Sequence, residues 1–176
     1  MAGSTGDEGE IVLVTPTLNL ARDFEALAME FLSAGESRYI DAARNLPAFI
    51  QRCQDDEIGR RRSDGWVPQS TFWMVRAGER ILGCSRVRHE LNAFLSHQGG
   101  HIGYDVRPSE RGKGYGTRLL RLTLQKARAL GLDEVLITAD EANPGSWKAI
   151  ERNGGRREPG LFDGTGGPFR RYRVRV

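Results

Sequence analysis

The stretch "RGKGYGTRLL", residues 111–120, places three glycines between two cations and leads directly into a leucine-rich run. Glycine at every second position is unusual, because helices disfavour it and ordinary turns need it only once or twice. Gly112, Gly114 and Gly116 leave backbone N–H groups uncovered by side chains. When such a loop begins a helix, the N–H groups converge and the helix dipole adds about half a positive charge. The stretch therefore predicts a loop that binds the phosphates of a small molecule.

The segments around this loop alternate between strand and helix patterns. "HIGYDV", residues 101–106, has the pattern of a strand and is followed by Pro108. Residues 117–131 form an amphipathic helix pattern that ends at Gly131. The apolar run 133–140 predicts a buried strand, and residues 143–155 predict a short helix capped by Asn143. Because two strands bracket a helix, we expect strands 101–106 and 133–140 to form a parallel pair with a crossover.

The rest of the chain completes an α/β pattern with a mixed sheet. Its expected elements are a strand at 10–16, helices at 19–35 and 46–59, a loop at 60–70, a hairpin at 70–91 with its turn at 77–79, a connection at 92–100, and a strand at 167–176. Phe72 and Trp73 read as core residues of the hairpin. Trp66 lies outside any predicted strand and is open to either role, core or pocket wall.

Two familiar nucleotide-binding motifs do not fit the loop. The P-loop pattern requires Ser or Thr after its lysine, but Lys113 is followed by Gly114. The dinucleotide fingerprint requires its third glycine one position later than Gly116.

The remaining pattern resembles the acetyl-CoA signature of the GNAT superfamily of N-acetyltransferases. It consists of Val106, Pro108, Arg111, Gly112, Lys113, Gly114, Tyr115 and Gly116. A second similarity follows at the family's distance, where a strand leads to Asn143, Ser146 and a short helix ending in "RNGG". The resemblance covers roughly residues 71–155, and it is carried by both motifs together with the order of elements.

The resemblance implies a single-domain α/β GNAT-like fold over residues 10–176, behind a mobile acidic tail at 1–9. Its central sheet would be mixed and mostly antiparallel, flanked by helices, with splayed parallel strands at the cofactor site. Backbone N–H groups from Arg111 to Gly116 would hold the pyrophosphate of coenzyme A. The N–H of Val106 would stabilise the oxyanion, and Asn143 and Ser146 would lie along the cofactor's arm.

Two catalytic positions are not settled by the resemblance. Many relatives have a general-acid tyrosine where this chain has Ile150, so another group must protonate the leaving thiol. Ser146 is a donor candidate, although a hydrogen bond at the helix start is its more ordinary role. For the base that takes the amine proton, Glu90 and His101 are the candidates, since neighbouring strands bring the end of "RHEL" close to the start of "HIGYDV".

Composition restricts the remaining possibilities. The chain has 176 residues, a net charge of +3 and 39% hydrophobic residues, which fits one globular domain and gives little support for nucleic-acid binding. Its start lacks a secretory signal, and no apolar run approaches the roughly 20 residues of a membrane helix, so we expect no membrane association and a cytoplasmic location. Cys53 and Cys84 give no metal-ligand spacing, and no metal is expected.

The sequence thus predicts an enzyme that transfers an acetyl group from acetyl-CoA to an amine by direct attack in a ternary complex. The acceptor would be a small-molecule or peptide amine, which the sequence does not identify. A non-catalytic acyl-CoA sensor is the alternative, because the tyrosine position is vacant. A homodimer formed through the terminal strands is also compatible with the resemblance.

Overall fold

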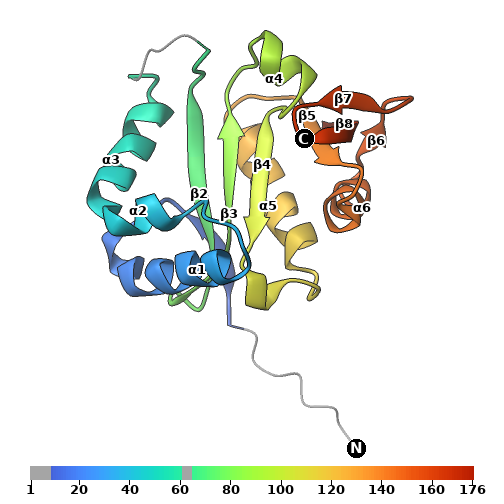
Figure 1. Ribbon diagram of the computed structural model, residues 1–176. Coiled ribbons are helices and arrows are strands. Elements are labelled where there is room, and N and C mark those ends of the chain that lie inside the picture. Colours follow the sequence, from blue (N-terminus) through green and yellow to red (C-terminus); the bar gives the residue numbers. More distant parts are fainter. Residues whose placement is uncertain (1–8, 61–64) are drawn as a thin grey trace, which may run out of the picture.

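The computed structural model describes residues 9–60 and 65–176, so most of the predicted acidic tail and part of the predicted 60–70 loop lie outside it. Strands and helices alternate much as the sequence predicts (Figure 1). The strands are β1 (Ile11–Val14), β2 (Gln69–Arg76), β3 (Arg80–Arg88), β4 (Ile102–Val106), β5 (Glu134–Asp140), β6 (Arg156–Arg157), β7 (Phe162–Gly164) and β8 (Gly167–Arg175). The α-helices are α1 (Ala21–Ser33), α2 (Ile40–Arg44), α3 (Leu46–Glu57), α4 (Ala93–His97), α5 (Tyr115–Ala129) and α6 (Pro144–Arg152), with 3₁₀ turns at Leu18–Leu20 and Pro108–Glu110.

The first sheet has the order β1-β2-β3-β4, and each neighbouring pair is antiparallel. The register places Trp73, Cys84 and Asp105 side by side across β2, β3 and β4. Since side chains alternate along a strand, these three share one face of the sheet. The neighbouring positions, which include Tyr104, face the opposite side.

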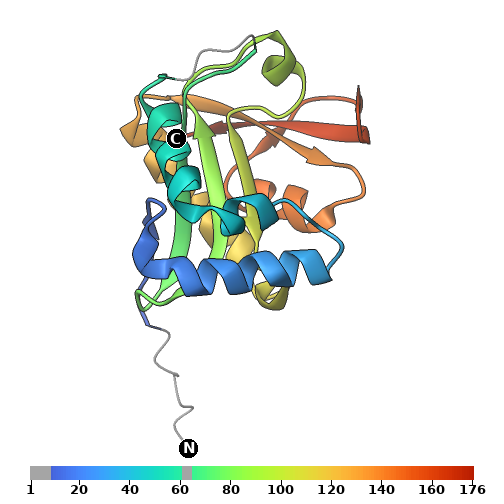
Figure 2. The same cartoon turned by 60° about the vertical axis from the view of Figure 1, so that its left-hand side comes forward.

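Helices α1, α2 and α3 cover the face that carries Trp73 (Figures 1 and 2). Their core is aromatic: the Phe24 ring stacks on Trp73 with centroids 4.6 Å apart, and Phe31 meets Tyr39 edge to face. Helix α5 covers the other face through a buried stripe that includes Leu119 and Leu120. The sheet is therefore the middle layer of three, as the amphipathic helix patterns predict.

A buried arginine fixes the end of β4 to α1. Arg107 is 1% exposed, and its guanidinium donates to Glu30 at 2.7 Å and to Asp23 at 2.9 Å. Burial alone would raise the pKa of the Glu30 carboxyl, but hydrogen bonds from Ser109 and Arg107 outweigh it and the pKa is lowered. The sequence does not predict this anchor, because an isolated arginine after a strand forms no recognisable pattern.

The second sheet has the order β5-β8-β6, with β7 also paired to β8, and all of its pairs are antiparallel. Helix α6 packs beside β5 and α5. The alternating pattern of the C-terminal strand is confirmed, because Tyr172 and Val174 are buried.

The predicted parallel ladder between strands 101–106 and 133–140 is not formed. Between the two sheets the described residues contain one bridge, Gly100–Ile137, and it is antiparallel. Gly100 has φ +62°, and a Cβ there would lie 2.3 Å from the Leu136 oxygen, so only glycine allows this close approach. Beyond this point β4 pairs only with β3 and β5 only with β8. Strands β4 and β5 thus separate, as expected, and they belong to two different sheets.

Two short helices were not predicted. Helix α2 follows the α1 turn, and α4 lies in the predicted 92–100 connection, where the Asn92 side chain caps it by accepting from Leu95 N at 2.8 Å. Each has five residues, too few for periodicity to be visible. Among the described residues, no helix is long and apolar enough to cross a membrane.

Candidate active site

The glycine loop, residues 111–116, begins α5 and is open on its outer side. Gly112 has φ +77°, and Gly114 has φ +84° at the N-cap of the helix. A Cβ built on either residue would meet no heavy atom within 4 Å. The left-handed backbone explains why glycine is needed, and the empty space beside it is what a bound diphosphate requires. The residues present therefore fit the predicted cofactor phosphates.

The other two members of the loop have different roles. Gly116 lies inside the first turn of α5, where a Cβ would be 3.6 Å from Val106 Cγ2. The Tyr115 side chain is buried, and its hydroxyl accepts a hydrogen bond from Arg76 at 3.1 Å. Tyr115 can thus contribute only its backbone to the open side of the loop.

Two cations of the glycine loop, Arg111 and Lys113, are bound to carboxylates. Arg111 donates to Glu36 at 2.7 Å and to the Val106 oxygen at 3.2 Å. Lys113 donates to Glu110 at 3.0 Å. Their side chains thus hold the loop against neighbouring elements as well as adding positive charge to it.

These ion pairs change the acidity of the carboxyl groups. Burial would raise the pKa of Glu36, but hydrogen bonds and charge from Arg111 and Arg38 outweigh it and the pKa is lowered. The pKa of Glu110 is lowered in the same way, since Lys113 and Arg80 outweigh its burial. Both groups are therefore anions at neutral pH.

The Val106 N–H points away from β3. Arg107 N donates to the Leu82 oxygen, so Leu82 and Arg107 form a hydrogen-bonded pair of the antiparallel ladder. Such pairs alternate with non-bonded ones, and the next pair is Gly83–Val106. Val106 therefore presents its N–H and C=O to the open edge of β4, and Arg111 already occupies the C=O.

Tyr104 connects this edge to α6. Its hydroxyl lies 3.1 Å from Ser146 Oγ and 3.2 Å from the Ser146 carbonyl oxygen. Burial raises the pKa of Tyr104, with the charge of Asp105 adding to the shift and the Ser146 bond opposing it. Ile150 is buried in the core. The protonated Tyr104 thus contacts Ser146, which lies one helical turn before Ile150, the position where many relatives have a tyrosine.

Asn143 caps α6 as predicted. Its Oδ1 accepts from Ser146 N at 3.1 Å. The residue is exposed, so its amide nitrogen can still face a ligand, as the resemblance implies.

A polar cluster that the sequence analysis missed surrounds Asp105 on the opposite face of β4. The carboxylate accepts from Arg38, from the Tyr39 hydroxyl at 2.8 Å and from Arg86 at 2.9 Å. Alternation in "HIGYDV" places Asp105 on a different face from Tyr104, but the partners come from elements far away in the sequence, so no local pattern shows them.

His101 is not arranged as a general base. Its Nδ1 accepts the Leu136 N–H at 2.9 Å, and a neutral ring that accepts at Nδ1 carries its proton at Nε2. Burial lowers the pKa of His101, and the charge of Arg173 adds to this. In this arrangement the ring has no free lone pair for an amine proton.

Glu90 is also distant from the open edge of β4. The predicted meeting of strand ends is confirmed, because Arg88 N donates to the His101 oxygen at 2.8 Å. His101, however, precedes Val106 by five residues, about 16 Å of extended strand. Glu90 follows the end of β3 and is exposed. It therefore does not touch the Val106 N–H.

Two adjoining cavities lie on the face of Asp105, and together we call them the arginine-lined cleft. The first has a volume of about 500 Å³ and the second about 260 Å³. They share Trp66, Gln69 and Arg86. Trp66 thus lines both cavities. Phe72 and Trp73 are buried, as predicted, and Trp73 also lines the second cavity.

The cysteines are buried and the described residues offer no metal site. Burial raises the pKa of Cys53 and raises that of Cys84 to about 12. No group of three or more His, Cys, Asp or Glu side chains in the described part of the chain is placed to hold a metal ion.

Comparison with known proteins agrees with this geometry. The sequence profile of the acetyltransferase (GNAT) family matches residues 37–155. The chain belongs to the GNAT acetyltransferase family. The matched region contains both β4 and the glycine loop, so the resemblance stated from the sequence is confirmed.

Individual relatives support the family and the fold. A mycothiol acetyltransferase of Thermobispora bispora is 28% identical over 139 residues, covering 74% of this chain and 46% of the relative. The chain therefore spans about half the length of this curated relative. The microcin C7 self-immunity acetyltransferase MccE, solved with acetyl-CoA and AMP, has a TM-score of 0.70 at 17% identity and covers 97% of this chain and 94% of its own. Mycobacterium smegmatis RimJ, solved with CoA-disulfide, has a TM-score of 0.72 at 17% identity, covering 96% and 83%.

Proposed function

We propose that this GNAT domain transfers an acetyl group from acetyl-CoA to an amine by direct attack. The observation that carries the proposal is the open glycine loop at the N-terminus of α5, next to an outward-pointing Val106 N–H. Such a loop binds phosphates through backbone N–H groups. The Val106 N–H belongs to β4, the strand that leads into this loop. The family match and structural relatives bound to acetyl-CoA or CoA-disulfide support the choice of cofactor.

The cofactor would supply an acetyl thioester, which an amine attacks readily once it is neutral. Val106 would donate its N–H to the thioester oxygen and stabilise the negative charge that develops there. Arg111 would assist by holding the Val106 carbonyl, which fixes the orientation of this peptide group. The carbon–sulfur bond breaks as the carbon–nitrogen bond forms, so the sulfur needs a proton.

We assign this proton to Tyr104. Its pKa is raised, so the hydroxyl is protonated at neutral pH, and it lies between β4 and Ser146 on the cofactor side. Ser146 would keep the phenol oriented and could pass a proton back to it from solvent. This places the general acid on β4 instead of α6, where Ile150 is buried.

The amine proton has no direct acceptor on the described residues beside Val106. Asp105 already accepts three hydrogen bonds, and Tyr39 has a pKa well above its ordinary value, mainly through burial. We propose that water in the cleft takes the proton, with Glu90, which follows the end of β3, as the candidate carboxylate that receives it. His101 would orient the start of β4 through Leu136 and take no part in proton transfer.

An acyl-cysteine route does not fit the geometry. Cys84 is fully buried and its pKa of about 12 keeps the thiol protonated. Cys53 is buried beneath the cleft and its pKa is also raised. Because the thiolate is the nucleophilic form, neither residue is suited to carry the acetyl group.

Two measurements test the proposal. Calorimetry with acetyl-CoA should give saturable binding, and a thiol-release assay should show turnover with at least one amine of a broad panel. Absence of binding would overturn the assignment of the glycine loop. Tight binding with no turnover for any amine would instead favour the acyl-CoA sensor.

A further inference from the structure

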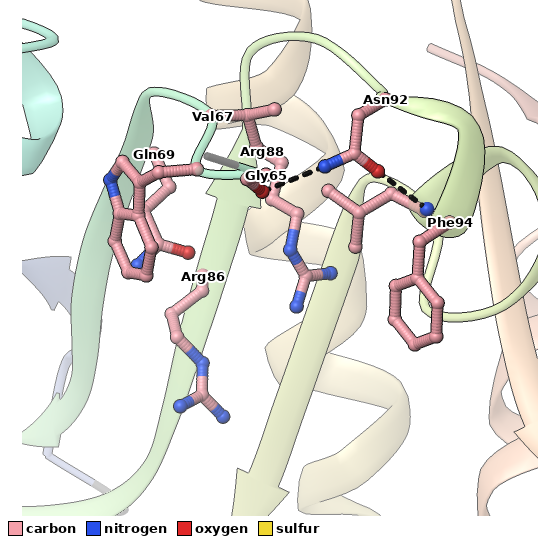
Figure 3. Close-up of a pocket in the computed structure, with 9 residues that line it drawn as sticks. Gly65, Val67, Gln69, Arg86, Arg88, Asn92 and Phe94 are labelled. Carbon is pink, nitrogen blue, oxygen red and sulfur yellow. Dashed lines mark hydrogen bonds between the residues drawn. The ribbon is translucent and has the colours of Figure 1, made fainter. Parts of the chain in front are cut away.

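The larger cavity of the arginine-lined cleft contains two guanidinium groups from one strand. Arg86 and Arg88 are two residues apart on β3, so both project from the same face. Figure 3 shows them extending from β3 in the same direction, beside the Gly65–Gln69 segment and the start of α4. Asn92 stabilises this wall by donating to the Gly65 oxygen at 2.7 Å and by capping α4.

The charges of the two arginines are balanced differently. Arg86 donates to the Asp105 carboxylate at 2.9 Å. Arg88 donates to the carbonyl oxygens of Gly100 at 2.8 Å and Gly99 at 3.4 Å, and within the described residues no carboxylate lies within ion-pair distance of it. Carbonyl groups orient the guanidinium but leave its positive charge in place. Burial lowers the pKa of Arg88, and the charge of Arg86 lowers it further.

The cleft is lined by more cations than carboxylates, and Asp105 beside it pairs with two of the cations. The lining cations are Arg38, Arg52, Arg86 and Arg88, the lining carboxylates are Asp41 and Asp56, and Asp105 binds Arg38 and Arg86. Asp41 also pairs with Arg44 outside the cleft. A polycationic acceptor would thus meet like charges, whereas an anionic group would meet a fork of donors suited to it.

We propose that Arg88, with Arg86, forms a subsite for a carboxylate on the amine acceptor. This inference rests on the proposed function, since it names the class of acceptor for the same reaction. A single unbalanced guanidinium matches the single charge of a carboxylate better than the double charge of a phosphate.

The register sets the length of the acceptor. Gly103 lies opposite Arg86, three residues from Val106, and His101 lies opposite Arg88, five residues from Val106. These separations correspond to about 10 and 16 Å along the strand. An extended peptide of four residues spans about 13–14 Å. We therefore expect an elongated acceptor, with its amine and its carboxylate roughly a tetrapeptide apart.

The residues that line both cavities connect the position of the acceptor's carboxylate with the position of its amine. Trp66, Gln69 and Arg86 line both cavities, and the second cavity extends to Tyr39 and Cys84, next to Asp105. An acceptor can thus run along the face of β3 from Arg88 toward the open edge of β4.

The experiment uses tetraglycine and tetraglycine amide, which differ only in the terminal carboxylate. With the full chain and saturating acetyl-CoA, kcat/KM should be at least about tenfold higher for the acid, as charged hydrogen bonds would give. In Arg88→Gln the ratio of the two values should fall to about one, mainly through KM. Because a ratio does not depend on the amount of folded protein, partial unfolding of the variant cannot mimic this result.

Controls address charge, length and the kind of anion. Arg128→Gln removes an exposed arginine from the last turn of α5 and should leave the ratio unchanged. Diglycine is too short to reach Arg88 and should show no preference over its amide. Triglycyl-phosphoserine amide places a phosphate at a similar distance, and a preference for it over tetraglycine would overturn the carboxylate assignment.

Two further results would also overturn the subsite. One is an equal kcat/KM for tetraglycine and its amide in the unmodified protein. The other is failure of tetraglycine to react while another amine, such as spermidine, is acetylated. Failure of acetyl-CoA itself to bind would instead reject the proposed function, so the two ideas fail separately.

Discussion

The candidate sites at the two ends of β4 are formed by different groups, backbone at one end and side chains at the other. At its C-terminal end the candidate cofactor site consists of backbone: the glycine loop, the N-terminus of α5 and the Val106 N–H. Beside its N-terminal end, the arginine-lined cleft consists of side chains from β2, β3 and the helices α2, α3 and α4, together with the segment before β2. Backbone groups need only the right local conformation, whereas the side chains must be assembled from elements far apart in sequence.

The two regions also differ in how they hold charge. Near the loop, cations pair with carboxylates, as in Lys113 with Glu110 and Arg111 with Glu36. In the cleft, Arg88 contacts only carbonyl oxygens among its described partners. The loop cations are thus neutralised before any ligand binds, whereas the Arg88 charge in the cleft is available to select an acceptor.

The largest effect is expected for Gly114→Val. A β-branched side chain at φ +84° is strained and would fill the space in which the phosphates must lie, so acetyl-CoA affinity should fall by about 100-fold or more, which is about 2.7 kcal/mol. Calorimetry measures this directly. Gly131→Val is the matched control, because Gly131 has the same φ at the other end of α5 and no atom within 4 Å of its Cβ position. Equal losses in both variants would mean that strain, and not the loop, controls binding.

The next effect is expected for Tyr104→Phe. Loss of a general acid typically costs about 100-fold or more in rate, and we expect kcat to fall by about this factor while acetyl-CoA affinity changes little. An acetyl thioester with a more acidic thiol should recover much of the loss. Tyr115→Phe also removes one buried hydroxyl bond, to Arg76, but should leave kcat nearly unchanged. A kcat unaffected by Tyr104→Phe would remove it from the mechanism.

A smaller effect is expected on stability, because the contributions of the two regions are lost in different pH ranges. The pKa of His101 is lowered from 6.5 by burial, so the folded state resists protonation and loses stability as the pH falls below 6.5 toward the folded pKa. Glu30, Glu36 and Glu110 have lowered pKa values, so their contribution is lost only as the pH falls below 4.5. His101→Asn should therefore flatten the upper part of the acid slope and leave the lower part. Urea unfolding across this pH range measures it.

His97→Asn serves as the control for this slope, since His97 is exposed. An unchanged slope in His101→Asn would show that the histidine is not buried in solution as it is in the structure.

The smallest effect is expected for Glu90→Gln. Glu90 lies about 16 Å or more from Val106 along the strands, and water can replace a remote carboxylate, so kcat/KM should fall by only about threefold. A loss of about 100-fold would mean that Glu90 reaches the amine directly and lies closer to Val106 than the strand register indicates.

Particular residues show why the local conformation of the glycine loop could be predicted from the sequence and the side-chain cluster around Asp105 could not. Gly112 and Gly114 were predicted from their spacing alone, because positive φ and an uncovered N–H are properties of the glycine itself. The Asp105 cluster with Arg38, Tyr39 and Arg86 could not be predicted, because its members come from three separate parts of the chain. His101 was proposed as a base from its strand position, and only its bond to Leu136 shows which nitrogen carries the proton.

Local sequence patterns were sufficient to predict most helices and strands, the glycine loop and the family, because periodicity and glycine spacing act over a few neighbouring residues. The tertiary structure alone decided that β4 and β5 separate into two sheets, that Tyr104 reaches Ser146 and that Arg88 has no carboxylate partner among the described residues. Such contacts depend on which distant segments pack together. Their energies come from burial and charge pairing across the fold, so no local sequence pattern predicts them.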